Sequence, residues 1–263
     1  MTHENSAVEV SKAGGVARIT LNRPDKFNPL SEEVLDALQS TLDEIGASPN
    51  IRVVVLAAKG RAFCAGHDLK QMRATTDKHY YLDLFQRCSR VMQTIMSIPQ
   101  PVIARVQGMA TAAGCQLVAT CDLAVAAQSA QFAVSGINIG LFCSTPAVAL
   151  SRNLSRKDAF EMLITGEFID AESARDRGLV NRVVADDDLD DEVGKLCDTI
   201  CAKLPIAVST GKAMYYKQLQ LGVEDAYALA GSAMAGNMMD PDTLEGVDAF
   251  IEKRKPDWPD APE

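Results

Sequence analysis

The segment from Val102 to Ala127 restricts the possible folds of this chain more than any other. It begins with an apolar, β-rich run at Val102–Val106, passes through a loop of small residues at Gly108–Gly114, and continues into an apolar helix at Cys115–Thr120. A second apolar run, Leu123–Ala127, follows directly. A strand that leads through a loop without bulk into a helix presents free backbone N–H groups, which can bind an anion or a developing negative charge. The same small residues would also let a helix pack closely against a strand, and this segment alone leaves both interpretations open.

A second segment of the same kind lies upstream. Val53–Ala58 is a continuous apolar run, and a loop of mostly small residues follows it from Lys59 to Asp68. Two such loops can each aim one N–H at a common point. The sequence therefore predicts an oxyanion hole with two backbone donors.

Apolar runs and helical patterns alternate along the first part of the chain, which favours an α/β fold with a mostly parallel sheet covered by helices. Further strands are expected at Val16–Leu21 and Ile51–Leu56, and helices after Ser31 and from Asp77 to Ile98. Beyond about Ser151 the pattern is mainly helical. The helices expected there are Arg156–Ile164, Ala171–Arg177, Asp187–Lys203, Pro205–Gln220, Val223–Gly236 and Asp242–Lys253, with one strand at Val180–Val184. We expect an α/β core over residues 1–200 and a C-terminal helical oligomerisation region over residues 201–263.

Six short motifs carry a resemblance to a known family. They are Ile19–Pro24 with Asn28, Ala65–Lys70, Gly108–Asp122, Leu163–Gly166, Gly178–Val180 and Phe250–Lys255. In this order they resemble the enoyl-CoA hydratase/isomerase family, also called the crotonase family, over nearly the whole chain. Within that family, Gly66–Asp68, Thr111–Asp122 and Gly140–Pro146 are most similar to a mitochondrial enoyl-CoA hydratase domain-containing subgroup. The resemblance implies the crotonase (ClpP-like) fold, with repeated ββα units and a C-terminal helical part, and a homotrimer or a dimer of trimers.

The resemblance also implies the site. The oxyanion donors would be the backbone N–H groups of His67 and Ala113, and the substrate would be a coenzyme A (CoA) thioester, with no permanently bound cofactor. The residues expected to contact CoA are Lys26, Ala65, Gly66, His67, Asp68, Leu69, Lys70, Gly114 and Lys253, the last across a subunit boundary. For the two lysines, Lys26 and Lys253, the alternative is a solvated surface charge. The His67 ring would either carry a proton or lie against the adenine, and Asp68 would cap its loop.

Two positions depart from the family pattern. Working hydratases of the family carry one glutamate on the helix after the oxyanion loop and a second about twenty residues later, where this chain has Gln116 and Gly136. Hydration needs a base and an acid, and a glutamine amide is neither, although it can orient a water molecule. Ordinary enoyl-CoA hydration is therefore expected to be slow or absent. Decarboxylation, isomerisation with a substitute base and thioester hydrolysis remain compatible, as does a non-catalytic acyl-CoA-binding or assembly subunit.

Cys143 and Ser144 follow the second vacated position and are the nearest candidates for substitute chemistry. A thiol with a lowered pKa could act as a nucleophile or base, whereas the alternative is a small residue packed at a helix start. Asp122, at the entry to a strand, is expected to form structural hydrogen bonds.

The composition excludes several other classes. A formal net charge of −9 argues against nucleic-acid binding, and no apolar run approaches the ~20 residues of a membrane-spanning helix. The seven cysteines lie mostly in apolar runs without metal-ligand spacing, so we expect reduced thiols and no metal. Residues Met1–Asn5 carry no basic or apolar stretch, which predicts a cytoplasmic protein without a leader.

Overall fold

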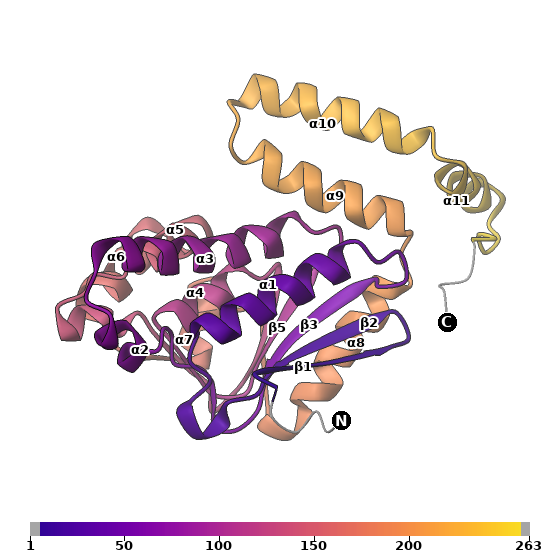
Figure 1. Cartoon of the computed structure of the whole chain (residues 1–263). Helices are drawn as coiled ribbons and strands as arrows, with labels where there is room; N and C mark the ends of the chain where they lie inside the picture. Colours follow the sequence, from indigo (N-terminus) through magenta and orange to yellow (C-terminus); the bar gives the residue numbers. More distant parts are fainter. Residues whose placement is uncertain (1–5, 259–263) are drawn as a thin grey trace.

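A six-stranded sheet forms the centre of the molecule (Figure 1). The structure is a computed structural model, and it describes residues 6–258. Neighbouring strands are parallel except for the first two, which form an antiparallel pair. In spatial order the strands are β1 (Val8–Ala13), β2 (Val16–Leu21), β3 (Val53–Ala58), β5 (Val102–Val106), β7 (Leu123–Ala127) and β10 (Arg182–Val184). The mostly parallel sheet is thus confirmed, and β1 is an edge strand that the sequence analysis did not predict.

A second, smaller sheet lies beyond the carboxyl ends of the long strands. Its strands are β4 (Ala62–Cys64), β6 (Met109–Thr111), β8 (Gln131–Ala133) and β9 (Ile169–Asp170), in this spatial order. β3, β5 and β7 are each followed by one of these short strands and then by a helical segment, which confirms the repeated ββα units of the crotonase fold. The prediction of a continuous loop over Gly108–Gly114 was wrong in detail, because β6 and the start of a helix lie within that segment.

Most of the helices occur close to where the apolar periodicity placed them, whereas Leu69–Ala74 and Ser144–Asn153 were not among the helices expected. The helices are α1 (Glu32–Gly46), α2 (Leu69–Ala74), α3 (Lys78–Ser97), α4 (Ala113–Thr120), α5 (Ser144–Asn153), α6 (Arg156–Thr165), α7 (Ala171–Asp176), α8 (Leu189–Cys201), α9 (Pro205–Gln218), α10 (Val223–Met238) and α11 (Pro241–Glu252). Short 3₁₀ turns occupy Pro24–Lys26, Ser135–Ile139 and Asp186–Asp188. The last of these delays the start of α8 by two residues relative to the expected Asp187.

Helices cover both faces of the large sheet. On one face α1 contributes a buried stripe that includes Leu35 and Leu42, and its first turn is capped by the Ser31 hydroxyl, which accepts a hydrogen bond from the N–H of Val34 at 3.4 Å. On the other face α8 packs Leu189 and Val193 against the inward side chains of β3, β5 and β7. The apolar contacts of α1 and α8 hold the sheet from both faces, and the sheet in turn positions the loops that follow the carboxyl ends of its strands.

The last three helices extend away from this body as an arm (Figure 1, orange to yellow). The arm is fastened at α9, where the buried Lys212 ammonium donates to Asp122 and to two backbone carbonyl groups. None of the residues of α10 is buried. Within residues 6–258, no helix combines the length and apolar character needed to cross a bilayer.

Candidate functional site

The first loop of the site joins β4 to α2. The carboxylate of Asp68 accepts hydrogen bonds from the N–H groups of Lys70 (2.9 Å) and Gln71 (3.1 Å), so Asp68 caps α2 as the sequence predicted. Gly66 takes a positive φ of 87°, a conformation that favours glycine. The loop therefore makes a sharp turn directly before His67.

The second loop joins β6 to α4. Ala112 has φ 50°, which is unusual for a residue with a Cβ atom, and its N–H donates to the carbonyl of Ala133 at 3.0 Å. Ala113 is the first residue of α4, so its N–H has no acceptor within the helix. Across the described part of the chain, neither this N–H nor that of His67 donates to a backbone acceptor.

The two loops are in direct contact. The Thr111 hydroxyl donates to the carbonyl of Ala65 at 3.1 Å. A Cβ atom placed on Gly66 would lie 3.1 Å from the amide nitrogen of Ala113, and one placed on Gly114 would lie 2.1 Å from the carbonyl oxygen of Cys64. Only glycine allows this approach, which brings the two unpaired amides to adjoining positions.

A cavity of about 240 Å³ opens beside these amides. Among the residues expected in the site, Ala65, His67, Leu69, Ala113, Gly136 and Cys143 line it. Its other walls come from α2, α3 and the segment that leads into α5, and most of them are apolar. The lining residues that were not expected from the sequence are Met72, Phe85, Ala112, Ser135, Ile139, Leu141, Phe142, Thr145 and Pro146. Ser144, a candidate for substitute chemistry, also lines the cavity.

His67 is the titratable group best placed in the cavity wall. Its Nδ1 lies 3.3 Å from the carbonyl oxygen of Leu30, which can only accept, so Nδ1 carries the proton and Nε2 has the lone pair. Nε2 is buried without a hydrogen-bond partner, and the ring meets the edge of Phe85 at 5.5 Å between centroids. Burial lowers the pKa of His67, opposed by the Leu30 carbonyl, so the ring is neutral at pH 7.

The two positions expected to hold glutamates in hydratases differ in their surroundings. Gln116 is buried on α4, and its Oε1 has no hydrogen-bond partner within residues 6–258. It lies one helical turn beyond Ala113 on α4, but it is not among the residues that line the cavity. At Gly136 an added Cβ would lie 2.6 Å from the carbonyl oxygen of Leu141 and 2.7 Å from the Cys143 sulfur. The local backbone thus leaves no room for a side chain at residue 136.

Burial favours the protonated thiol form of the cysteines near the site. Burial raises the pKa of Cys143, and its Sγ lies 3.7 Å from the carbonyl oxygen of Val134. Burial also raises the pKa of Cys64 and of Cys115 to about 12. A thiolate at Cys143 is therefore disfavoured, and the structure supports the alternative of a small residue packed before α5.

The charged residues expected at CoA lie outside the cavity wall. Lys26 is exposed in the turn Pro24–Lys26, Lys70 is exposed on α2, and Lys253 is exposed just beyond α11, far from α2 in the chain (Figure 1). Lys253 has a positive φ of 58° at the end of its helix. Over the described residues, no group of three or more His, Cys, Asp or Glu side chains is arranged to hold a metal ion.

Comparison with known proteins decides the family. The sequence profile of the Enoyl-CoA hydratase/isomerase family matches residues 11–261. This chain belongs to the enoyl-CoA hydratase/isomerase family. It is similar to the human mitochondrial enoyl-CoA hydratase domain-containing protein 3, with 45% identity over 94% of this chain and 82% of that protein. The Xenopus laevis protein of the same name is 44% identical over 93% of this chain and 83% of its own length.

Solved structures share the fold closely. An enoyl-CoA hydratase from Mycobacterium smegmatis is 58% identical, covers 97% of this chain and 99% of its own, and superimposes with a TM-score of 0.96. The structure of human enoyl-CoA hydratase domain-containing protein 3 is 44% identical, covers 96% of this chain and 100% of its own, and superimposes with a TM-score of 0.93. The crotonase fold expected from the motifs is thereby confirmed.

The comparisons correct the expected location. The human and Xenopus laevis relatives are both named mitochondrial proteins, which contradicts the cytoplasmic location predicted from the sequence. That prediction rested on residues 1–5, which lie outside the described residues.

Proposed function

We propose that this chain binds an acyl-CoA thioester and stabilises the enolate of its acyl group with the backbone N–H groups of His67 and Ala113. The observation that carries this proposal is the contact between the two loops, which places two unpaired amides side by side at the edge of an apolar cavity. Preorganised donors of this kind lower the barrier where negative charge develops on a carbonyl oxygen.

In the proposed step, a base takes a proton from the carbon next to the thioester carbonyl. The electron pair of that C–H bond forms the enolate, whose oxygen accepts hydrogen bonds from the two amides. His67 is the candidate base in the cavity wall, because its ring is neutral and its Nε2 carries an unpartnered lone pair. Nε2 is buried in this structure, so the step requires the ring to turn toward the acyl group. Cys143 fits less well, since burial raises the pKa of its thiol.

The apolar walls of the cavity favour an uncharged acyl group. Leu69, Met72, Phe85, Ile139 and Phe142 are among the lining residues, and a second carboxylate would lie against them without a cation. The close packing at Gly136 argues against the two-glutamate chemistry of hydration. Reversible enolate formation, as in isomerisation with a substitute base, is the reaction class that these walls support best.

Hydrogen exchange at the acyl group tests this proposal. Butyryl-CoA is incubated with the protein in D₂O, and deuterium at the carbon next to the carbonyl is followed by mass spectrometry. We expect uptake with the native chain and a loss of about 10²–10³-fold in Ala113→Pro, which removes one donor at a helix position where proline is tolerated. Thermal unfolding checks that the variant is folded. Binding of butyryl-CoA without any exchange would instead support a non-catalytic acyl-CoA-binding subunit.

Contacts with CoA outside the cavity belong to the same proposal. Lys26 would contact a phosphate within the subunit, and Lys253 would do so from a neighbouring copy of the chain in a trimer or a dimer of trimers. The supporting observation is that both ammonium groups are exposed and that neither forms an ion pair within residues 6–258.

A further inference from the structure

One wall of the cavity is a helix that contacts the apolar core through a single partly buried side chain, Met72. α2 contributes Leu69 and Met72 to the cavity, yet none of its six residues is buried. A short helix without buried side chains gains little from packing, so its position depends on the polar contacts that its neighbours make with it.

Two of those contacts link α2 directly to other helices. The Gln71 side-chain oxygen accepts a hydrogen bond from the backbone N–H of Glu32 at 3.0 Å, and this N–H belongs to the first turn of α1, which has no acceptor inside its own helix. The Tyr81 hydroxyl donates to the carbonyl of Met72 at 3.1 Å. α2 is thus joined to α1 on one side and to α3 on the other.

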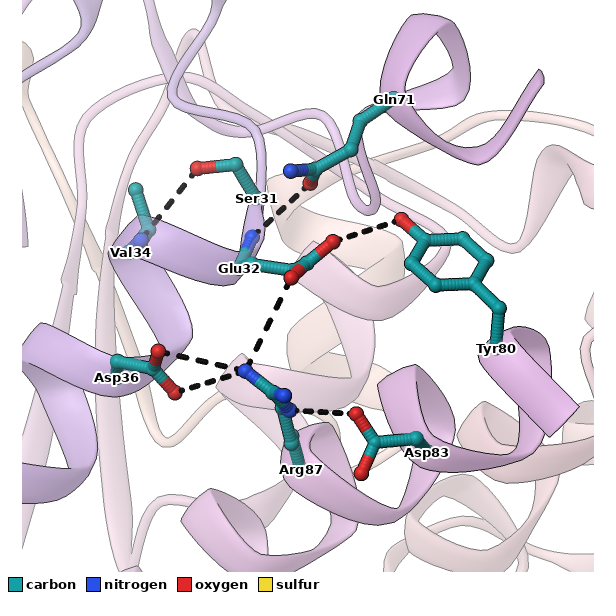
Figure 2. A network of polar contacts seen from close by, with 8 residues as sticks. All are labelled: Ser31, Glu32, Val34, Asp36, Gln71, Tyr80, Asp83 and Arg87. Atoms are coloured by element: carbon teal, nitrogen blue, oxygen red, sulfur yellow. Dashed lines mark hydrogen bonds and ion pairs between the residues drawn. The ribbon is translucent and has the colours of Figure 1, made fainter. Parts of the chain in front are cut away.

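A charged cluster then joins α1 to α3 (Figure 2). The Glu32 carboxylate accepts a hydrogen bond from the Tyr80 hydroxyl at 2.9 Å and lies 3.9 Å from the Arg87 guanidinium. Arg87 also pairs with Asp83 at 2.7 Å and with Asp36 at 3.4 Å. Glu32 is the centre of the arrangement, because its backbone contacts α2 while its side chain contacts α3.

We propose that this set of residues, Glu32, Gln71, Tyr80, Tyr81 and Arg87, determines which acyl groups the cavity accepts by holding α2 in place. We refer to it as the α2 clamp. The proposal rests on the proposed function, since it concerns the acyl group of a bound thioester. The side chains of the clamp do not line the cavity, so they are positioning residues rather than catalytic ones.

Residues of both α2 and α3 line the cavity in which the acyl group would lie. Met72 and Leu69 on α2 face the same cavity as Phe85 on α3, so the distance between the two helices sets the width available to an acyl chain. When a clamp contact is lost, α2 can move outward, and only the partly buried Met72 side chain then loses core packing. A short acyl chain then loses contacts with the wall, whereas a longer chain can fill the additional space.

The test measures the ratio of the dissociation constants for butyryl-CoA and decanoyl-CoA by calorimetry. Tyr81→Phe and Gln71→Ala each remove a hydrogen bond between α2 and a neighbouring helix, and we expect each to shift the ratio about 2–10-fold toward decanoyl-CoA. Glu32→Gln keeps an acceptor for Tyr80 and should retain the native ratio. Glu172→Ala is the matched control, because it breaks an ion pair with Arg175 on α7.

The possible outcomes distinguish failure of the clamp proposal from failure of the proposed function. A ratio that shifts in Tyr81→Phe and Gln71→Ala but not in Glu32→Gln or the control supports the clamp. An unchanged ratio in the first two variants, with measurable binding, overturns the clamp and leaves the proposed function intact. Failure of the native chain to bind either thioester overturns the proposed function, and the clamp proposal with it.

Discussion

At the scale of single residues, His67 combines two roles in one position. Its backbone N–H belongs to the proposed oxyanion hole, and its ring forms part of the cavity wall. Burial lowers the pKa of the ring below its value in the unfolded chain, about 6.5. The unfolded state therefore binds a proton at higher pH than the native state. The stability linked to the neutral ring is present above about pH 6.5 and is lost as the pH falls through the native pKa.

We expect the native chain to lose more stability between pH 7 and pH 5 than His67→Gln does. Urea unfolding at both pH values measures the difference. His79→Gln, which removes an exposed histidine on α3, should lose as much as the native chain. An equal loss in all three proteins would show that the His67 ring titrates alike in the folded and unfolded states.

Residue roles were predictable from the sequence where the role is local. Asp68 caps its helix through N–H groups two and three residues away, and capping needs no knowledge of the tertiary structure. Phe85 and Met72 could not be assigned to the cavity, because which side of α2 and α3 meets it depends on how those helices pack. The site assignments themselves came from the family resemblance, and their chemical roles remain predictions.

At the scale of elements, the segment from β8 to α5 decides whether hydration chemistry can be restored. The N–H of Leu141 donates to the carbonyl of Gly136 at 3.0 Å, and the Leu141 carbonyl occupies the space of a side chain at residue 136. We expect Gly136→Glu to destabilise the protein by about 1–3 kcal/mol, because the backbone of residues 141–143 would have to move. Gln116→Glu replaces a side chain of the same shape and should be tolerated better.

Thermal unfolding and loss of enoyl absorbance with crotonyl-CoA check this prediction. Gln116→Glu should lower the midpoint less than Gly136→Glu does, because it buries a carboxyl group without moving the backbone, and it should gain at most slow hydration, since hydration uses both an acid and a base. Gly136→Glu should unfold earlier. Rapid hydration by the native chain would contradict the premise that the replaced glutamates matter.

A second element-scale prediction concerns the attachment of the arm. The Lys212 ammonium donates to Asp122 at 2.7 Å and to the carbonyls of Ile95 (2.7 Å) and Gln100 (2.8 Å), while the Tyr216 hydroxyl donates to Asp122 at 2.7 Å. Lys212→Met leaves the Asp122 carboxylate buried without a cation, which should cost about 3–5 kcal/mol in urea unfolding. Adding Asp122→Asn removes the stranded charge and should recover part of the loss. No recovery would mean that the packing of α9, rather than the charge pair, matters.

The sequence predicted long elements better than short ones. α1 and α3 each carry an apolar stripe over several turns, and the ends expected for α3 were one residue from those observed. β4, β6 and β8 have three residues each, too few for a periodic pattern, and β6 consists of residues that also suit a loop. These strands pair only because the ββα units bring them together, so they depend on the tertiary fold.

At the scale of the whole molecule, the arm presents apolar surface that the chain does not cover. Its large exposed apolar residues are Ile206, Tyr215, Leu219, Leu221, Val223, Tyr227, Met234, Met238, Met239, Leu244, Val247, Phe250 and Ile251. Tyr227 is 77% exposed and Phe250 is 85% exposed. A patch of this extent on a soluble domain marks an interaction surface, and the family resemblance predicts other copies of the chain as the partner.

We expect the native chain to sediment as a trimer or a dimer of trimers at micromolar concentration. Tyr227→Glu together with Met234→Glu should shift it toward smaller species, because two buried carboxylates would then face apolar side chains of the neighbouring copy. Leu82→Glu, which adds a charge at an exposed apolar residue of α3, is the matched control and should not change the assembly. If Lys253 reaches CoA from a neighbouring copy, the double variant should also bind butyryl-CoA more weakly than the control does. A native chain that is monomeric at this concentration would contradict both the assembly and any contribution of Lys253 from a second subunit.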